Sequence, residues 1–479
     1  MPRIDEYEHQ DAIGLAAWVR AGEVSPQELL EAAAARVEAR NPAINAVVIR
    51  AFEEGRKAIE AGLPDGPLRG VPWLLKDLHA AWKGVRLTSG SRFFAENVSD
   101  YDSELVARYR RAGLVLFGRS ASPEFGVTST TESVLYGATR NPWLPSHSAG
   151  GSSGGAAAAV ATGIVPAAHA TDGGGSIRIP ASCCGLFGMK PTRARVPSGP
   201  KLGEGWSGMS VQHAVSRSVR DSAALLDAAA GPALGDPYFA PPSARSYLEE
   251  VGRDPGRLRI ALQTTAFNGA EVDPDCAAAA RDAAELCRSL GHEVEEANLS
   301  IDREAMSRAC GTIICASLRA TLLERAADLG RDVTADDIEP LTWLMAEGIK
   351  QAGAADYVSA LRVIHSLGRQ VSSFFTDYDA LLTPTMATPP LPLGRLALTR
   401  PDVPALNADL ARTIGFTQLF NASGHPAMSV PLYWNGAGLP IGVQFAGRFG
   451  DEATLFRLAA QLESARPWFL RRPVVVSGG

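Results

Sequence analysis

The sequence predicts an α/β fold in which helices cover both faces of a central sheet. Short apolar runs that suit buried strands, such as residues 71–75 and 164–170, alternate along the chain with helix-forming segments. Of the 479 residues, 46% are hydrophobic and 20% are charged, which supplies enough apolar side chains for a large core. The Pro-, Gly- and Ser-rich stretch 234–256 does not force a break, so we expect a single domain over residues 1–479.

The first half of the chain begins with two expected helices over residues 7–41. Ser25 and Glu28 form a capping box with Pro26 at the first helical position, so the second helix starts there. An apolar strand over 71–75 ends on Lys76. The other elements expected in this half are a helix over 102–112, a strand over 114–117 closed by Gly118, loop over most of 120–150, an alanine-rich helix over 156–161 and a buried strand over 164–170.

The second half continues the alternation of strands and helices. Residues 431–434 and 441–446 flank a turn that contains Gly and Pro, which predicts a hairpin. The other elements expected here are strands over 258–263 and 292–296, a strand over 379–382 that stops at Thr383-Pro384, an amphipathic helix over 276–290, mostly helical structure over 302–375 and a last helix over 452–462.

The charge balance and composition argue against several classes of partner. The chain has 46 Lys and Arg against 52 Asp and Glu, a net charge of −6, so we expect no nucleic-acid or membrane surface. No apolar run reaches the roughly 20 residues that span a bilayer, and residues 1–10 are charged, unlike a secretory signal. The six cysteines form no Cys-x-x-Cys pair, so we expect reduced thiols and a cytoplasmic protein.

Three consecutive glycines precede Ser176 and give the strongest chemical signal in the sequence. Glycines adopt backbone conformations closed to other residues, so successive N–H groups can converge on one point. Such a cradle beside a hydroxyl suits acyl transfer, in which the attacked carbonyl oxygen becomes an oxyanion. We therefore interpret Ser176 as a nucleophile, with an idle serine in a glycine-rich turn as the alternative. The expected oxyanion hole consists of the amides of Gly173, Gly174, Gly175 and Ser176.

A serine nucleophile needs a base, and Lys76 is the candidate. His147 and His169 flank the glycine-rich stretches, but neither has a carboxylate in a recognisable arrangement, and loop exposure or core packing accounts for them better. Burial at the end of an apolar strand would lower the pKa of Lys76 from roughly 10.4 towards neutrality. The alternative is a surface lysine paired with a carboxylate.

The order of motifs along most of the chain resembles the amidase signature family. The run GGSSGG lies at 150–155, 24 residues before Ser176 when counted from Ser152, and Lys76 lies in GVPWLLKD at 70–77. Further matching segments are 122–125, 130–132, 136–137, 141–142, 185–192, 421–427 and 438–444.

The resemblance implies an α/β/α sandwich with a large mixed central β-sheet and an amide hydrolase without metal or cofactor. It implies Lys76 as base, Ser152 as a bridging serine on a cis peptide, and Ser176 as the nucleophile that forms an acyl-enzyme. Arg178 would support the loop or, as the second choice, face an anionic group of the substrate. The other residues expected to bind substrate or support the loop are Asp172, Thr171, Gly126 and Ser153.

Several rival interpretations remain weaker. Gly-x-Ser-x-Gly occurs around Ser152 and Ser153, but no strand precedes it as an α/β-hydrolase elbow requires. Ser198 and Lys201 are separated by Gly-Pro, no Gly-Lys-Ser/Thr follows the glycine loops, and no histidine spacing suggests zinc. Within the family, the alternatives are the glutamine-hydrolysing subunit of a tRNA-dependent amidotransferase and a catalytically silent binding protein.

The substrate is less defined than the chemistry. Segments 141–143 and 190–192 resemble the subgroup that opens the cyclic dimer of 6-aminohexanoate, a nylon oligomer, while other members cleave aryl acylamides or urethanes. We expect a small-molecule amide substrate and a wide apolar pocket lined by 125–136, 305–345 and 414–421. Ala149, Ala121 and 193–197 depart from the family pattern and leave the substrate open. The oligomeric state also stays open, with a homodimer as one option.

Overall fold

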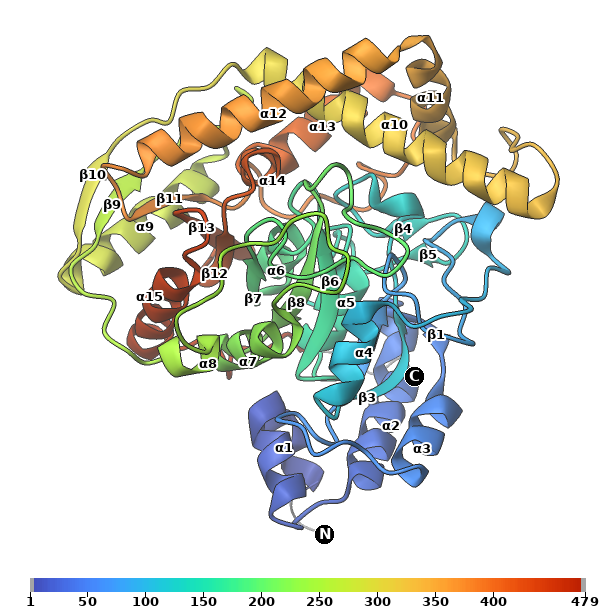
Figure 1. The fold of residues 1–479 in the computed structure, drawn as a ribbon. Helices are drawn as coiled ribbons and strands as arrows, with labels where there is room; N and C mark the ends of the chain where they lie inside the picture. The colour runs from blue at the N-terminus through green and yellow to red at the C-terminus, as the bar shows by residue number, and fades with distance from the viewer. Residues whose placement is uncertain (1–3, 475–479) are drawn as a thin grey trace.

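The computed structural model describes residues 4–474 and contains a large central sheet beside a small one (Figure 1). The large sheet has eight strands in the order β10-β9-β11-β13-β12-β7-β8-β6, and the small one has three in the order β1-β3-β2. The strands of the large sheet are β6 Ala167–Asp172, β7 Phe187–Lys190, β8 Val211–Ser216, β9 Arg259–Leu262, β10 Glu293–Glu296, β11 Ala380–Pro384, β12 Ala427–Trp434 and β13 Pro440–Gly447. The remaining strands are β1 Val47–Arg50, β2 Pro72–Lys76, β3 Val115–Ser120, and the short pair β4 Glu132–Ser133 and β5 Gly137–Ala138.

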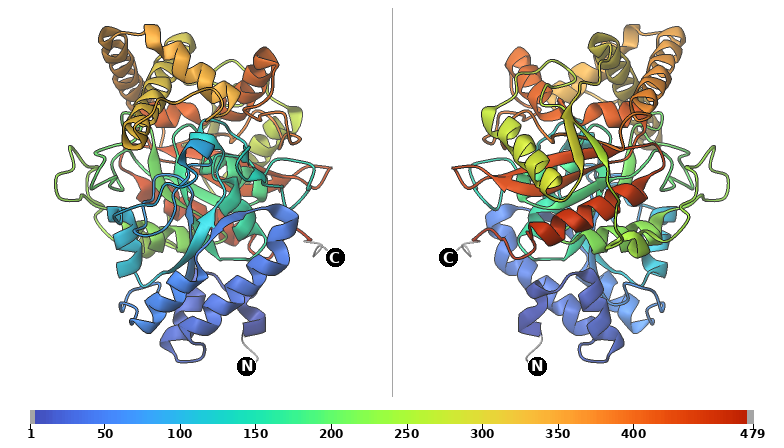
Figure 2. Two further views of the ribbon diagram at one scale, coloured as in Figure 1. Left: turned by 90° about the vertical axis from the view of Figure 1, so that its right-hand side faces the viewer. Right: turned by 90° about the vertical axis from the view of Figure 1, so that its left-hand side faces the viewer.

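The large sheet is mixed, which confirms the predicted fold class. β9 runs parallel to both β10 and β11, whereas β13 is antiparallel to β11 and β12, and β8 is antiparallel to β6 and β7. The helices α7, α9 and α15 lie in front of the sheet in the right-hand view of Figure 2, and α5 and α6 pack on its strands β6, β12 and β13. Helices therefore flank the sheet as the sequence predicts.

Two groups of helices lie at opposite ends of the molecule. At one end of the molecule lie α1 to α3, and at the opposite end α10, α11, α12 and α13 form a helical cap (Figure 1). The α-helices are α1 Ala12–Arg20, α2 Pro26–Ile44, α3 Phe52–Glu60, α4 Glu104–Arg111, α5 Gly154–Ala161, α6 Arg178–Cys184, α7 Val219–Ala229, α8 Tyr247–Glu250, α9 Pro274–Ser289, α10 Arg303–Leu329, α11 Pro340–Gly348, α12 Ala354–Phe374, α13 Val403–Ile414, α14 Gln418–Ser423 and α15 Glu452–Ala465. Short 3₁₀ helices are η1 Ile4–His9, η2 Arg92–Phe94, η3 Glu124–Gly126 and η4 Ile349–Gln351.

The predicted elements agree with the structure except at several boundaries. The capping box is present, because the Ser25 hydroxyl accepts from Glu28 N and the Glu28 carboxylate accepts from Ser25 N. The strand expected over 164–170 begins only at Ala167, because Ile164 N donates to Ala159 O and closes α5. Elements that the sequence interpretation did not foresee include β1, α3, α6, β7, β8, α7, α13 and α14.

Four strands extend beyond their predicted ends, namely β3, β6, β11 and β13. β3 continues through Gly118 to Ser120, where the glycine allows close packing because a side-chain carbon there would lie 2.7 Å from Ile49 O. β11 includes Thr383 and Pro384, which were expected to stop it, and the proline occupies the last strand position.

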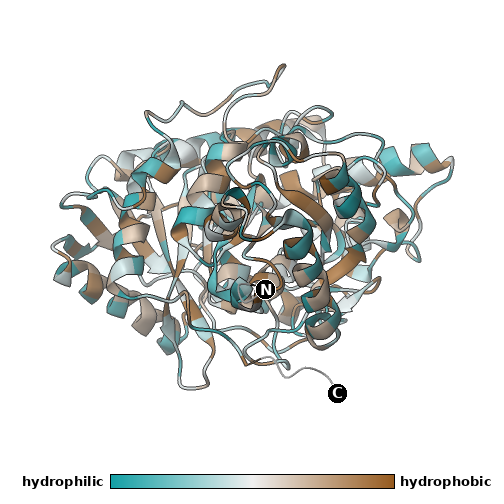
Figure 3. Cartoon of the chain, turned by 90° about the horizontal axis from the view of Figure 1, so that it is seen from below, coloured by the Kyte–Doolittle hydropathy of each residue, from teal (hydrophilic) through white to brown (hydrophobic). Residues whose placement is uncertain are grey.

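Hydrophilic residues concentrate on the outer helices and loops, and hydrophobic segments on the inner strands (Figure 3). Among residues 4–474, no helix is both long and apolar enough to cross a membrane.

Helix α5 is buried along its whole length and joins the two sheets. A side-chain carbon on Gly155 would overlap Ala121 N and lie 2.7 Å from the carbonyl oxygens of Ala121 and Ala46. These atoms belong to the backbone and cannot move aside as a flexible side chain can. The glycine thus lets α5 approach β1 and β3, and it fixes the turn that precedes the helix.

Gly155→Ala should therefore lower the free energy of unfolding by roughly 1–3 kcal/mol, the usual cost of overpacking a core. Gly348→Ala is the matched control, because a side-chain carbon at this helical position meets nothing within 4 Å. Urea unfolding followed by circular dichroism measures both. Equal stability of the two variants would contradict the close packing of α5.

Candidate active site

Lys76 lies at the end of β2 with its amine enclosed among hydroxyl groups. Its side chain is fully buried. The amine Nζ lies 2.7 Å from Ser152 Oγ and 2.8 Å from Thr171 Oγ1. Burial lowers the pKa of Lys76 well below its usual value, and the negative charge of Asp172 opposes this shift only in part. The structure thus brings an amine that favours the uncharged form into contact with two hydroxyls.

The backbone of Lys76 is held by two other buried side chains. Its N–H donates to His169 Nδ1 at 3.1 Å, and its carbonyl oxygen accepts from Arg119 Nη1 at 3.1 Å. Burial, with the nearby charges of Lys76 and Arg119, lowers the pKa of His169 well below its usual value. His169 is therefore a neutral core residue that stabilises β2, in agreement with the interpretation of His169 as a packed core residue.

Ser152 is placed by the turn before α5. The Gly151–Ser152 peptide bond is cis, as the family resemblance implied. Gly126 has a φ of 68°, and a side-chain carbon there would lie 3.0 Å from Ser152 Oγ. Ser153 braces β6 instead, because its hydroxyl donates to Thr171 O at 3.2 Å and accepts from Thr171 N at 3.3 Å. Gly126 and Ser153 thus shape the surroundings of Lys76 and Ser152.

The glycine loop after β6 curls around the carboxylate of Asp172. Gly175 N donates to Asp172 Oδ1 at 2.8 Å, and Ile177 N donates to Oδ2 at 3.1 Å. The Gly175 amide, one of the expected oxyanion donors, therefore already has an acceptor in this carboxylate. Gly174 and Ser176 line the neighbouring cavity, which leaves the amides of Gly173, Gly174 and Ser176 as candidate donors.

Arg178 lies at the centre of a hydrogen-bond network that holds this loop. Its guanidinium pairs with Asp172 through Nε to Oδ2 and Nη2 to Oδ1, both at 2.9 Å, and both side chains are fully buried. The remaining N–H groups donate to Thr417 O at 2.9 Å, Gln444 Oε1 at 2.7 Å and Asn421 Oδ1 at 2.7 Å. All guanidinium donors are thereby used inside the protein, which favours the supporting role over the ligand role.

The partners of Arg178 include residues whose roles the sequence interpretation missed. Asn421 Nδ2 donates to Asp172 O at 2.9 Å and to Asp172 Oδ1 at 2.8 Å, and Gln444 Nε2 donates to Phe416 O at 2.8 Å. Burial raises the pKa of Asp172, but the charge and hydrogen bonds of Arg178 outweigh it and leave the pKa well below its usual value. The sequence signal was present in the segments 421–427 and 438–444, which matched the family without revealing what these residues hold.

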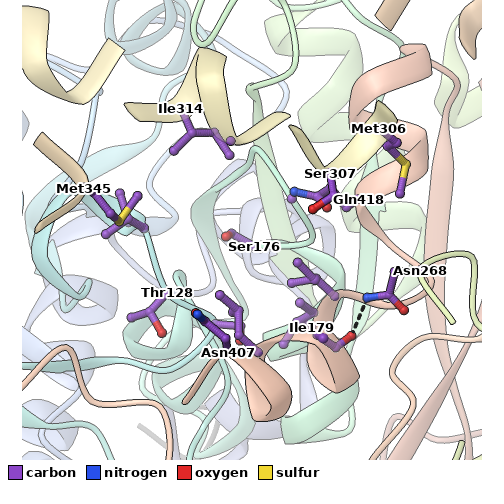
Figure 4. A pocket seen from close by; sticks show the side chains of 18 of the residues that line it. Thr128, Ser176, Ile179, Asn268, Met306, Ser307, Ile314, Met345, Asn407 and Gln418 are labelled. Carbon is purple, nitrogen blue, oxygen red and sulfur yellow. Dashed lines mark hydrogen bonds between the residues drawn. The ribbon is translucent and has the colours of Figure 1, made fainter. Parts of the chain in front are cut away.

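A cavity of about 670 Å³ opens beside Ser176, which is half-buried (Figure 4). The predicted segments 125–136, 305–345 and 414–421 all contribute to its walls, whereas the contributions of Trp206, Asn268 and α13 were not foreseen. The residues that line it are Gly126, Val127, Thr128, Ser129, Gly174, Ser176, Ile179, Trp206, Asn268, Arg303, Glu304, Met306, Ser307, Gly311, Ile314, Leu341, Met345, Asn407, Leu410, Ala411, Ile414 and Gln418.

The side chains that metals prefer are scattered in the part of the chain that the structure describes. No three His, Cys, Asp or Glu residues among 4–474 come together as a metal site. The six cysteines are unpaired thiols, five of them buried. The groups near Ser176 that suit acyl transfer are the hydroxyls and amides of the cavity wall and the Lys76 amine beside Ser152.

Comparisons with known proteins agree with this chemistry. The family profile described as Amidase matches residues 28–456. The 6-aminohexanoate-cyclic-dimer hydrolase of Pseudomonas sp. (strain NK87) is 40% identical over 489 residues, covering 100% of this chain and 98% of that protein. The acylamidase of Rhodococcus erythropolis is 35% identical over 470 residues, 96% of each chain. A solved structure of 6-aminohexanoate cyclic dimer hydrolase has a TM-score of 0.93 at 40% identity, covering 97% of this chain and 99% of that one.

One comparison bears on the amidotransferase alternative. The solved structure of a glutamyl-tRNA(Gln) amidotransferase subunit from Thermotoga maritima has a TM-score of 0.76 at 24% identity, covering 99% of each chain. At an identity this low, the likeness shows only that the two proteins share a fold. This amidotransferase protein is thus a more distant neighbour than the amide hydrolases.

Asp172→Asn should destabilise the protein by roughly 3–5 kcal/mol, because the Arg178 guanidinium then stays buried without its counter-charge. Asp100→Asn is the matched control, since the Asp100–Lys201 pair at 2.9 Å is exposed to solvent. That variant should unfold at nearly the wild-type urea concentration. Similar unfolding midpoints for the two variants would show that the buried pair does not anchor the loop.

Proposed function

The chain belongs to the amidase signature family, and we propose that it hydrolyses carboxamide C–N bonds with Ser176 as nucleophile, Ser152 as proton relay and Lys76 as base. The observation that carries this proposal is the contact of 2.7 Å between the buried Lys76 amine and Ser152 Oγ, because Ser152 lies against Gly126, which lines the same cavity as Ser176. The depressed pKa of Lys76 supports it, because only the uncharged amine can accept a proton.

In the acylation step, Ser176 Oγ attacks the carbonyl carbon of the amide. Its proton passes to Ser152 Oγ while the proton of Ser152 passes to the lone pair of Lys76 Nζ. Thr171 Oγ1 accepts an N–H of the same amine at 2.8 Å, which orients the lone pair towards Ser152. The resulting ammonium is stabilised by the charge of Asp172, the same interaction that raises the pKa of Lys76.

The developing oxyanion is bound by backbone N–H groups of the glycine loop. We assign this role to the amides of Gly173, Gly174 and Ser176, because the Gly175 amide already donates to Asp172. Fixed donors of this kind stabilise the transition state without reorganising during the reaction. The Asp172–Arg178 pair supports this proposal, since it holds the loop rigid.

The relay then runs in reverse to break the C–N bond. Lys76 returns its proton through Ser152 to the leaving nitrogen, and the amine departs, which leaves the acyl group on Ser176 Oγ. A water molecule attacks the acyl carbon and gives one proton through Ser152 to Lys76. Collapse of this second intermediate releases the carboxylic acid and returns a proton to Ser176.

The cavity supports amides with apolar groups as substrates. Its apolar walls include Ile314, Leu341 and Met345 from the helical cap, and the two relatives named above act, by their names, on 6-aminohexanoate cyclic dimer and on acylamides. We therefore propose nylon-type oligoamides, aryl acylamides and urethanes as substrate classes. The protein acts as a single domain. Its proposed location is the cytoplasm, which the unpaired cysteines support.

The amidotransferase and silent-protein alternatives have less support. The amidotransferase structure shares the fold at 24% identity, whereas the amide hydrolases reach 40% over the whole chain. Burial of an amine against two hydroxyls costs solvation free energy, and a catalytically silent protein would gain nothing from this arrangement.

Replacement of the relay tests the proposed function on para-nitroanilides, whose hydrolysis is followed by absorbance. Ser176→Ala should lower kcat by at least roughly a thousandfold, and Ser152→Ala and Lys76→Met by roughly a hundredfold or more. In the wild type, kcat/KM should fall as the pH drops below the depressed pKa of Lys76, because the protonated amine is no base.

Lys190→Met is the matched control for Lys76→Met. Lys190 is also fully buried, and burial lowers its pKa to about 7, but its amine donates to Pro191 O at 2.8 Å. It should keep near-wild-type kcat, with circular dichroism confirming the fold of each variant. Near-normal turnover by Lys76→Met would refute the assignment of the base.

Thr171→Val tests how the amine is oriented. Loss of the hydroxyl removes an acceptor for Lys76 Nζ, so kcat should fall by roughly tenfold, the value of one buried hydrogen bond. The acidic limb of the pH profile should move to lower pH, because the ammonium loses a stabilising acceptor. Thr171→Ser should restore both quantities, and an unchanged pH profile in the valine variant would argue against the orienting role.

A further inference from the structure

The cavity beside Ser176 has two unlike sides. Figure 4 shows Ser176 between Ile314 and Met345 on one side and Ser307, Gln418 and Asn268 on the other. The first side presents the apolar side chains of Ile314 and Met345 together with the polar Thr128 and Asn407, whereas on the second side hydroxyl and amide groups gather near Met306. One arm of a substrate can therefore pack on Ile314 and Met345 while a polar arm reaches Ser307, Gln418 and Asn268.

Helix α10 contributes to both sides of the cavity. Arg303, Ser307, Gly311 and Ile314 all line it, and their spacing of three or four residues places them on one helix face. Along this face the residue type changes from cationic to hydroxyl, then to glycine and finally to an apolar side chain. The first turn of α10 thus brings the guanidinium of Arg303 to the cavity, which the neighbouring Glu304 also lines.

The guanidinium of Arg303 lies over the turn at Gly269. A side-chain carbon on Gly269 would overlap Arg303 Nη1 and lie 3.3 Å from Cζ, and the φ of this glycine is +79°. The adjacent Asn268 is fixed, because its Nδ2 donates to Ala411 O at 2.8 Å and its Oδ1 accepts from Ala270 N at 3.1 Å. The bare glycine therefore leaves room for the guanidinium next to an ordered amide.

The charge of Arg303 is not neutralised within residues 4–474, since no carboxylate there lies within ion-pairing distance of it. The neighbouring acids are engaged elsewhere. Glu304 lies 3.6 Å from Arg308, and Asp302 caps α10 by accepting from Ala305 N at 2.9 Å. Arg303 itself is exposed. Among the described residues, Arg303 thus offers an unpaired guanidinium at the rim, next to a carboxylate of Glu304 that lies towards Arg308. Its planar geometry is the one that binds carboxylates through two parallel hydrogen bonds.

We propose that Arg303, with Asn268 and Ser307 beside it, binds a carboxylate at the end of the polar substrate arm. The enzyme then favours open-chain amides that end in a carboxylate over neutral amides of the same length. This inference rests on the proposed function, because the subsite serves the same Ser176 centre.

A matched series of substrates tests the subsite. One series consists of mono-para-nitroanilides of dicarboxylic acids from succinate to suberate, and the other of fatty-acid para-nitroanilides of equal chain length. The wild type should prefer the carboxylated partner at one chain length, and the preference should shrink as salt is added, since an exposed charge is screened. Arg303→Gln should lower the ratio of the two kcat/KM values by roughly two- to fivefold, the range for an exposed ion pair.

Arg281→Gln is the matched control. Arg281 is an exposed arginine of α9 that does not line the cavity, so its replacement makes the same change in net charge and should leave the ratio as in the wild type. Arg303→Lys should retain part of the preference. A wild type without preference at any chain length, or an Arg303→Gln ratio equal to that of the wild type at low salt, would overturn the subsite.

A binding measurement separates failure of the subsite from failure of the proposed function. If Ser176→Ala still hydrolysed the neutral anilides, the proposed nucleophile would be wrong whatever the carboxylate does. If no anilide is hydrolysed, titration calorimetry of the carboxylated anilides with Ser176→Ala protein still measures the subsite. The double variant Ser176→Ala/Arg303→Gln should bind the carboxylated anilides roughly two- to fivefold more weakly, and unchanged affinity would reject the subsite.

Discussion

The arrangement of the site depends on one buried ion pair, that of Asp172 and Arg178. Removing two charges from water is costly, and the attraction between them compensates only when the remaining donors and acceptors are also satisfied. Here the carboxylate accepts from the amides of its own loop, and the guanidinium reaches Thr417, Asn421 and Gln444. The loop that carries the candidate nucleophile is thereby tied to α14 and β13, far away in the sequence, and a single network sets its shape.

The second constraint is a balance of two effects on Lys76. Burial favours the uncharged amine, the charge of Asp172 favours the ammonium, and burial has the larger effect. Lys190 shows that a depressed pKa alone does not mark a base, because burial acts on it in the same way while its amine contacts a carbonyl oxygen. What distinguishes Lys76 is its pair of hydroxyl neighbours, which can pass a proton onward.

Much of this architecture could be predicted from local signals in the sequence. The capping box at Ser25 and the apolar strand ending at Lys76 can each be recognised from a few consecutive residues. The order of the family motifs along the chain also identifies Ser152 and Ser176. The engagement of the Gly175 amide could not be predicted, because it depends on the direction in which a neighbouring carboxylate turns. The same holds for Asn268 and Trp206, whose segments reach the cavity only through tertiary packing. Strands β7 and β8 are buried at every position although they contain Lys190, Gln212 and His213, so their sequences show neither an apolar run nor an alternation.

The helical cap has a consequence for how this enzyme can change. The three relay candidates lie on β2, on the turn before α5 and after β6, whereas α10, α11 and α13 furnish much of the opposite wall of the cavity. Chemistry and selectivity are thus encoded by separate stretches of the gene. Recombination or saturation libraries confined to residues 303–348 and 403–414 would explore new amide substrates while sparing the reaction centre. Because of this separation, the substrate-binding residues can change while the residues of the hydrolytic reaction stay the same.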